Sequence, residues 1–255
     1  TGVDRHSVLA IFGRETAFGS YTLPHDAIRV LATQAWVGRR KEQFRVELIH
    51  ALRMLEDGVP RARMRASWAG AMGLTQFLPS EFFQHAESIT GQGRADLFTS
   101  VPDALASAAN YLKALGWQAG QPWIEEVRVP ENLAWEQADL AITHPRAKWA
   151  KAGLLKSTGE PLDADDLPAA LVLPMGRNGP AFLVYDNFRI VYLKWNESLI
   201  YALSAAYNAT RLAGAPPVSK GRGTVAAFGY KEIVELQKLL LARGYDVGKP
   251  DGKLG

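Results

Sequence analysis

The 255-residue chain contains no cysteine, and this absence excludes disulfide bonds, thiolate metal sites and cysteine nucleophiles. No apolar run approaches the roughly 18 residues that a membrane-spanning helix needs. The net charge is only +3, which is too small an excess to predict nucleic-acid binding. The H-E-x-x-H, G-x-S-x-G, P-loop and dinucleotide-binding motifs are also missing. Chemistries that depend on these features are therefore disfavoured.

Hydrophobic residues make up 47% of the chain, so a substantial core can form. The length allows one large domain with a small appendix. Helical periodicity, with glycines at the expected helix ends, dominates the first half of the chain and returns later. The spacing predicts helices over residues 4–19, 23–38, 40–58, 100–117 and 196–214, and a last one that begins near residue 230.

The composition changes at Pro122, after which β-branched and aromatic residues become frequent. Runs over residues 123–129, 169–176 and 181–195 favour strands, and Asp186-Asn187 divides the last run as a hairpin turn would. The predicted fold class is therefore mainly α, with a small antiparallel β subdomain over about residues 122–196.

The C-terminal part of the chain has a different character. Residues 214–228 are rich in Gly, Pro and Lys, which predicts a linker between a main domain over residues 1–213 and the rest. Residues 229–255 contain one amphipathic helix and a turn-rich tail, too little to bury a core alone. This last segment is therefore a truncated module, or it docks on the main domain.

One acidic residue, Glu15, stands among apolar ones in the segment IFGRETAFGSY. Ile11, Phe12 and Phe18 lie three or four residues away, so on a helix Glu15 falls within the apolar stripe. Burial disfavours the charged form of a carboxyl group, so Glu15 tends to keep its proton. The pattern alone leaves two roles open, a structural hydrogen-bonding partner and a general acid.

Small and polar residues alternate over residues 66–83, ASWAGAMGLTQFLPSEFF. The small ones would let another backbone or a ligand approach closely, and the polar ones provide donors and acceptors. A helix-packing seam of small residues is the alternative interpretation. The small residues are Ala69, Gly70, Ala71 and Gly73, and the polar ones are Ser67, Thr75 and Gln76.

Four segments resemble, in order, signatures of the B-type lytic murein transglycosylases. They are GRETAFGSYT, AGAMGLTQFLPS, ANYLKALGW and WNESLIYALSAAYN. The twelve-residue second segment is the most specific, and the resemblance covers about residues 3–212. The tail from Val234 resembles the first part of a type-1 peptidoglycan-binding domain and lacks its later helices.

This resemblance implies a lysozyme-like helical catalytic domain that acts on peptidoglycan glycan strands. The family cleaves the β-1,4 bond between N-acetylmuramic acid and N-acetylglucosamine without water, and leaves a 1,6-anhydro ring. By motif position, Glu15 would be the catalytic acid/base. The residues that would contact substrate are Ser67, Gln76, Tyr111, Trp195 (where a tyrosine is common), Asn196 and Tyr201. A monomer in the periplasm or bacterial cell envelope, without a cofactor, is expected.

A single carboxyl group is enough for this reaction. Most glycosidases use two carboxyl groups, the second as a nucleophile or to activate water. When the sugar's own C6 hydroxyl is the nucleophile, one carboxyl can protonate the leaving oxygen and then accept the hydroxyl proton. An apolar setting that raises the pKa of Glu15 would keep it protonated for this role.

The chain departs from the family pattern in two places. Some relatives carry a calcium-binding loop after the central motif, but here Ser88, Thr90 and Gln92 stand where carboxylates are wanted. The remaining acids are poorly spaced, so no metal is predicted; they are Glu87, Asp96 and Asp103. Gln43 replaces an aromatic residue of the family, which puts one sugar contact in doubt.

Two other functions stay open. A muramidase that uses water would need a second carboxylate near Glu15, for which Glu42, Glu47, Glu56 and Asp57 are candidates in principle. A wall-binding or scaffold protein could keep the cleft without turnover, although the joint presence of Glu15, Ser67 and Gln76 disfavours it.

Overall fold

The computed structural model describes residues 1–91, 93–225 and 227–253. Four residues lie outside these ranges: Gln92 of the predicted loop, Ala226 of the predicted linker and the last two residues of the predicted module.

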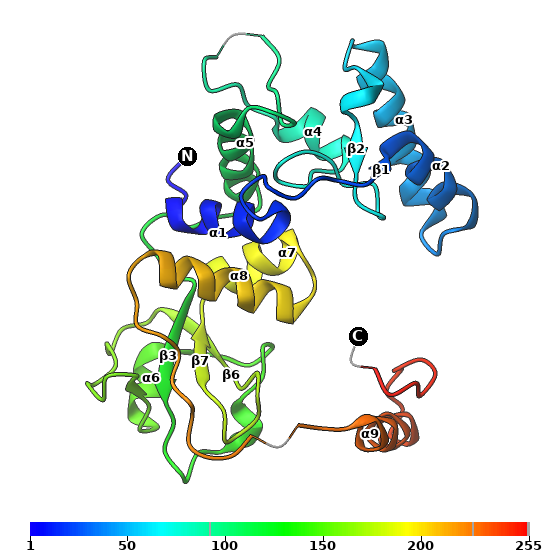
Figure 1. Ribbon diagram of the computed structural model, residues 1–255. Coiled ribbons are helices and arrows are strands. Elements are labelled where there is room, and N and C mark those ends of the chain that lie inside the picture. Colours follow the sequence, from blue (N-terminus) through cyan, green and yellow to red (C-terminus); the bar gives the residue numbers. More distant parts are fainter. Residues whose placement is uncertain (92, 226, 254–255) are drawn as a thin grey trace.

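Helices form the body of the molecule and the predicted helical segments are confirmed (Figure 1). Asp4 begins α1 by accepting the backbone N–H groups of His6 and Ser7. Asp26 caps α2 in the same way, so this helix begins later than the predicted residue 23. The helices of the body are α1 (Arg5–Thr16), α2 (Ala27–Val37), α3 (Lys41–Glu56), α4 (Pro79–His85), α5 (Val101–Ala114) and α8 (Leu199–Leu212).

The predicted small sheet is confirmed and is antiparallel throughout, with strand order β4-β6-β7-β3-β5. The strands are β3 (Ile124–Arg128), β4 (Thr143–Pro145), β5 (Leu155–Lys156), β6 (Pro168–Val172) and β7 (Ala181–Val184). Turn η2 (Trp135–Gln137) and helix α6 (Arg146–Lys151) complete this part. Turn η1 (Arg61–Arg63) and a separate short ladder between β1 (His25–Asp26) and β2 (Arg65–Ala66) belong to the helical body, beside α2 and α3 (Figure 1).

The predicted hairpin at Asp186-Asn187 is wrong. After β7 the chain continues as η3 (Asn187–Tyr192), a π-helical segment, and α7 (Leu193–Trp195). The buried side chain of Asn187 donates to the carbonyl oxygens of Gln118 and Gln121, both at 2.9 Å. Phe188 and Tyr192 are fully buried at helical spacing. These tertiary contacts favour the helix over the β-propensity of the run.

Helix α8 lies between α1 and the sheet (Figure 1). One buried cluster joins α1, α5 and α8 to one face of the sheet, and a second lies among α2, α3, α4 and α5. A third cluster, which includes Trp149 and Leu171, fills the other face of the sheet. Trp195 packs against both the first and the second cluster. Its indole therefore lies where the two cores meet.

The segment that follows α8 is hydrogen-bonded to the sheet over residues 218–224, which we call the strap. Ser219 N–H donates to Glu126 Oε1 at 3.0 Å, and Arg222 N–H donates to the carbonyl of Asn178 at 2.7 Å. The first part of the predicted linker is thus held against the sheet.

Helix α9 (Tyr230–Ala242) follows the strap and lies beyond the sheet (Figure 1). The side-chain oxygen of Gln237 accepts the backbone N–H groups of Asp251 and Gly252, and this closes the turn after the helix. The likeness of this segment to a peptidoglycan-binding domain, and the domain boundaries, stay predictions.

Candidate active site

Glu15 lies on the last turn of α1, where its carboxyl group is held by two aromatic side chains. Trp195 Nε1–H donates to Glu15 Oε1 at 3.0 Å, and the Tyr201 hydroxyl donates to the same oxygen at 2.5 Å. No hydrogen bond from the described residues reaches Oε2, so this oxygen can meet a ligand. Burial raises the pKa of Glu15, although the bonds from Trp195 and Tyr201 and the charge of Arg14 oppose the rise.

The expectation that Glu15 belongs to an apolar stripe agrees with this environment. Ile11 and Phe12 are buried in the same helix. Phe18 departs from the expectation, because it lies beyond the end of the helix and is 59% exposed, with its ring edge-on to Phe12 and the centroids 5.8 Å apart. The helix ends at Ala17, which has a left-handed backbone. Thr16 Oγ1 donates to the carbonyl of Leu74 at 2.7 Å, so the end of α1 is tied to the central loop.

The central loop, residues 67–78, is not a helix, so the helix-seam interpretation of its small residues is wrong. Gly70 and Gly73 have φ of +86° and +73°, where side chains are rarely tolerated. A Cβ atom on Gly73 would lie 2.6 Å from the carbonyl oxygen of Leu97, and one on Gly70 would lie 2.3 Å from the Leu31 side chain. These glycines therefore let the loop pack tightly on α2 and on the segment before α5.

Gln76 of this loop has a left-handed backbone although it carries a side chain, with φ at +58°. Its Nε2 donates to the carbonyl of Gly73 at 3.0 Å. This bond leaves the amide oxygen of Gln76 able to accept a hydrogen bond. Strain of this kind is found where a side chain must point in one direction.

A cavity of about 410 Å³ opens beside Glu15. Of the seven predicted site residues, the structure brings six into its lining: Glu15, Ser67, Gln76, Tyr111, Trp195 and Asn196. They come from α1, the central loop, α5 and the end of α7. Tyr201 is not part of the lining, and its hydroxyl contacts Glu15 instead. The structure therefore shows Tyr201 in contact with the carboxyl group of Glu15, and its contact with substrate stays a prediction.

The aromatic residues of the site form a cluster. The Trp195 ring centroid lies 5.3 Å from that of Tyr111 and 5.9 Å from that of Phe77. His85 stacks on Tyr111, with centroids 4.3 Å apart and an interplanar angle of 12°. One face of Tyr111 is therefore covered by the protein, and the cluster fixes the indole that holds Glu15.

A second carboxyl group, that of Glu81 on α4, lies in the same cavity and was not predicted from the sequence. Leu78 N–H donates to Glu81 Oε2 at 2.7 Å, and the Tyr111 hydroxyl donates to Oε1 at 3.0 Å. Burial raises the pKa of Glu81, and the charges of Glu47 and Glu15 add to the rise. Glu81 lies three residues after Leu78, the N-cap of α4, which is the spacing of a capping box. This spacing is the one sequence feature that could have drawn attention to Glu81.

Other residues of the lining come from α3 and the central loop: Arg40, Gln43, Phe44, Trp68, Ala69, Ala71 and Leu78. Gln43, the departure from the family pattern, thus faces the cavity. Trp68 is 70% exposed there, which is unusual for so large an apolar side chain. Exposed aromatic faces of this kind suit the flat faces of sugar rings.

Two acids, one in the loop before α5 and one in the first turn of α5, accept hydrogen bonds from the backbone of this loop. Asp103 accepts the N–H groups of Ile89 and Asp96, and Asp96 accepts those of Phe98 and Thr99. Among the described residues, no group of three or more His, Cys, Asp or Glu side chains could hold a metal ion. Gln92 lies outside that part of the chain, and the absence of a metal stays a prediction.

Comparison with known proteins identifies the family of the chain. Residues 1–210 match the family described as Transglycosylase SLT domain. Membrane-bound lytic murein transglycosylase B of Escherichia coli (strain K12) is 38% identical over 207 residues, which are 80% of this chain. The chain spans only 55% of the length of that relative.

Solved structures give the same result. SltB3 from Pseudomonas aeruginosa, in complex with NAG-NAM-pentapeptide, is 43% identical, with a TM-score of 0.88, and the match covers 99% of this chain and 68% of that one. Escherichia coli Slt35, in complex with bulgecin A, is 30% identical, with a TM-score of 0.70, over 83% of this chain and 66% of that one. The predicted lysozyme-like helical fold is confirmed, and the chain belongs to the Transglycosylase SLT domain family.

Proposed function

We propose that this protein is a peptidoglycan lytic transglycosylase that cleaves the MurNAc-β-1,4-GlcNAc bond, with Glu15 as its single general acid/base. The observation that carries the proposal is the carboxyl group of Glu15 at the wall of the cavity. Its pKa is raised by burial, and one of its oxygens is fixed by Trp195 and Tyr201. Such a group is protonated at higher pH than an exposed carboxyl, as a general acid requires.

The proposed reaction balances with the groups present. Glu15 gives its proton to the bridging oxygen, so GlcNAc leaves with a free hydroxyl group. The C6 oxygen of MurNAc then bonds to its own C1, and the C6 hydroxyl proton returns to Glu15. No water enters, and the enzyme ends in its starting protonation state. The side chains of Ser67, Gln76 and Asn196, which share the cavity, are proposed to orient the sugar.

The hydrolytic alternative needs an ionised second carboxylate. None of the acids considered from the sequence belongs to the cavity lining, and buried Glu47 accepts the backbone N–H and hydroxyl of Ser80. Glu81 does line the cavity, but each of its oxygens accepts a protein hydrogen bond and burial raises its pKa. These contacts disfavour Glu81 as a nucleophile or as the base for a water molecule.

Digestion of purified sacculi tests the reaction directly. The purified chain should release fragments whose muramyl ends carry the 1,6-anhydro ring, measured by mass spectrometry as a mass about 18 Da below that of the reducing product, the mass of one water. Reducing ends would identify a hydrolase. Sacculi that are bound but not cut would identify a wall-binding protein without turnover.

We also propose that the protein acts in the periplasm or elsewhere in the bacterial cell envelope, as a monomer that binds glycan strands. The name of the E. coli relative, a membrane-bound murein transglycosylase, supports this location. In the described part of the chain, no helix is both long and apolar enough to cross a membrane.

The pH profile should report the state of Glu15. Because the acid works only while protonated, activity should fall as the pH rises through its raised pKa. Tyr201→Phe removes a hydrogen bond that favours the charged form, so the pKa of Glu15 should rise further and the alkaline limb of kcat should move to higher pH. The measurement is kcat against pH for both proteins.

Tyr207→Phe is the matched control, because Tyr207 lies on the same helix and its hydroxyl accepts the N–H of Val218 instead. Its alkaline limb should coincide with that of the parent. An unchanged or lowered limb in Tyr201→Phe would show that the hydroxyl does not act on the proton of Glu15.

A further inference from the structure

The carboxyl group of Glu15 changes its charge during the proposed reaction. It is neutral before it protonates the bridging oxygen, and it is ionised until the C6 hydroxyl proton returns. Burial is the largest influence on this group and favours the neutral form. The two side chains that hold Oε1, Trp195 and Tyr201, are uncharged donors. A positive charge close to these donors would stabilise the ionised form further.

Arg14 supplies a positive charge at this place. Its guanidinium carbon lies 5.4 Å from the ring centroid of Tyr201, within the distance of a cation–aromatic interaction, about 6 Å. The hydroxyl of the same ring donates to Glu15 Oε1 at 2.5 Å. Arg14, Tyr201 and Glu15 thus form a chain of contacts, in which the cation lies over the ring and the acid accepts from its hydroxyl group.

A cation over a phenol ring acts on the carboxyl group in two ways. It draws electron density from the ring and makes the hydroxyl a stronger donor, because successive polar contacts polarise one another. Its charge also attracts the carboxylate directly. Burial raises the pKa of Glu15, and the charge of Arg14 opposes this rise. Both effects of the cation favour the ionised form.

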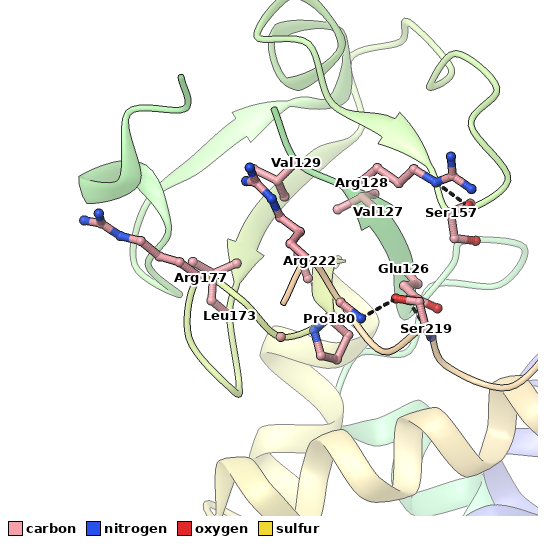
Figure 2. Close-up of a pocket in the computed structure, with 13 residues that line it drawn as sticks. Glu126, Val127, Arg128, Val129, Ser157, Leu173, Arg177, Pro180, Ser219 and Arg222 are labelled. Atoms are coloured by element: carbon pink, nitrogen blue, oxygen red, sulfur yellow. Dashed lines mark hydrogen bonds between the residues drawn. The ribbon is translucent and has the colours of Figure 1, made fainter. Parts of the chain in front are cut away.

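Arg14 has no other polar contact within the described ranges of the chain. Its side chain is exposed and does not line the cavity of the candidate active site. Arg222 provides a contrast, since it lines the cavity between the strap and the sheet and lies 5.5 Å from the ring centroid of Trp135 (Figure 2). Arg222 also donates to the carbonyl of Pro130 at 3.3 Å. The Arg14 side chain is held by the Tyr201 ring alone among the described residues.

A second set of the same three residue types lies in the sheet subdomain. The guanidinium carbon of Arg146 lies 5.9 Å from the ring centroid of Tyr185, whose hydroxyl donates to Glu125 Oε2 at 2.5 Å. Arg146 also forms an ion pair with Asp165, which neutralises much of its charge. The arginine on α1 has no such acid among the described residues, so its charge is left to act through the ring.

Other titratable groups line the cavity beside Glu15: Arg40, Glu81 and Tyr111. Glu81 accepts the Tyr111 hydroxyl, and the guanidinium carbon of Arg40 lies 5.6 Å from the ring centroid of Phe44. In the part of the chain that the structure describes, none of the three forms a hydrogen bond or an ion pair with Glu15. Among these residues, the cation that reaches the carboxyl group through a contact is Arg14.

We propose that Arg14 is a positioning residue for Glu15, an inference that rests on the proposed function. Arg14 holds the Tyr201 hydroxyl on Oε1 and stabilises the carboxylate in the interval between the departure of its proton and the return of another. Burial keeps the acid protonated at the start of the reaction, and the Arg14–Tyr201 pair keeps it from being too weak an acid to give the proton up.

The kinetics of Arg14→Met test this role. On the low-pH plateau kcat should fall by about two- to fivefold, the worth of a cation–aromatic contact at an exposed site. The alkaline limb of kcat should move to higher pH, because the pKa of Glu15 rises further without the charge. KM for a soluble glycan fragment should stay unchanged, since Arg14 does not line the cavity.

Two further variants serve as controls. Arg14→Lys keeps a charge that can lie over the ring, so it should recover most of the lost kcat. Arg5→Met makes the same change as Arg14→Met in the first turn of the same helix. Its kcat, its KM and its alkaline limb should all match those of the parent.

A measurement that needs no turnover separates this inference from the proposed function. The pKa of Glu15 is read from the pH dependence of the carbon resonance of its carboxyl group, which is assigned by its absence in Glu15→Gln. The pKa should be higher in Arg14→Met than in the parent. This rise should be smaller in a Tyr201→Phe background, because the hydroxyl that carries part of the effect is missing there.

An unchanged pKa of Glu15 in Arg14→Met, or a rise of the same size in Arg5→Met, would overturn the inference. A rise of equal size with and without the Tyr201 hydroxyl would also overturn it, because the charge would then act without the contact. If the proposed function fails, no anhydromuramyl product forms and the changes in pKa remain. If this inference fails, product forms at a rate that does not depend on Arg14.

Discussion

Replacing Glu15 with glutamine should lower the rate of anhydromuramyl product formation by about 10³-fold, the usual contribution of a general acid. The change keeps the size of the side chain and an oxygen that can accept from Trp195 Nε1 and the Tyr201 hydroxyl. It removes only the transferable proton. The measurement is the initial rate of product release from sacculi, together with the affinity for an uncleaved glycan fragment, which should change little.

Glu81→Gln is the matched comparison, because it makes the same chemical change in the same cavity. If Glu15 works alone, this variant should lose less than about tenfold, mainly through the weakened support of Tyr111. Equal losses in the two variants would show that two carboxyl groups share the chemistry, as in a hydrolase. Activity in Glu15→Gln near that of the parent would remove the basis of the proposed function.

Replacing Gly73 with alanine should destabilise the protein by about 2–3 kcal/mol and reduce activity as well. The backbone there has φ +73°, and the new Cβ would lie 2.6 Å from the carbonyl oxygen of Leu97. That oxygen accepts the N–H of Leu74 at 2.8 Å, and the carbonyl of Leu74 in turn accepts the hydroxyl of Thr16. Displacing the loop would therefore disturb the end of the helix that carries Glu15.

Two causes contribute to the loss of stability in Gly73→Ala, the positive φ and the close contact of the new Cβ with Leu97. Gly58→Ala has only the first of them. Gly58 has φ +87°, but a methyl group added there would have no neighbouring heavy atom within 4 Å in the described part of the chain. Only the backbone cost of about 1 kcal/mol should therefore appear. Urea unfolding of both variants measures the difference in the free energy of unfolding. A loss in Gly73→Ala no larger than in Gly58→Ala would mean that the loop adjusts without strain.

The position of Glu15 could be predicted because it depends on local spacing. A 3.6-residue period over Ile11, Phe12 and Glu15 needs no knowledge of the rest of the fold. The two groups that hold the carboxyl, Trp195 and Tyr201, lie 180 and 186 residues further along the chain. Only the resemblance to a family could connect them with Glu15, and it assigned Tyr201 a different task, contact with substrate.

The segment after Asp186 shows where periodicity fails. Its apolar residues are dense enough to fit a strand or a helix, and β-branched and aromatic residues favoured the strand. The helical structure is favoured by hydrogen bonds of Asn187 with Gln118 and Gln121. These residues are distant in the sequence, so no local pattern could predict the bonds. Strands β4 and β5 were missed for a related reason, since two or three residues carry no measurable alternation.

The π-helical turn of η3 makes the position of Trp195 depend on chain length. A wide turn holds one residue more than an α-helical turn, and one residue corresponds to about 100° of rotation. An added or lost residue in η3 would therefore rotate α7 about its axis. This rotation would turn the indole of Trp195 away from α1. We therefore expect the loss of one residue between β7 and Trp195 to reduce the proposed activity more than a conservative substitution there, because the loss would turn the indole away from Glu15.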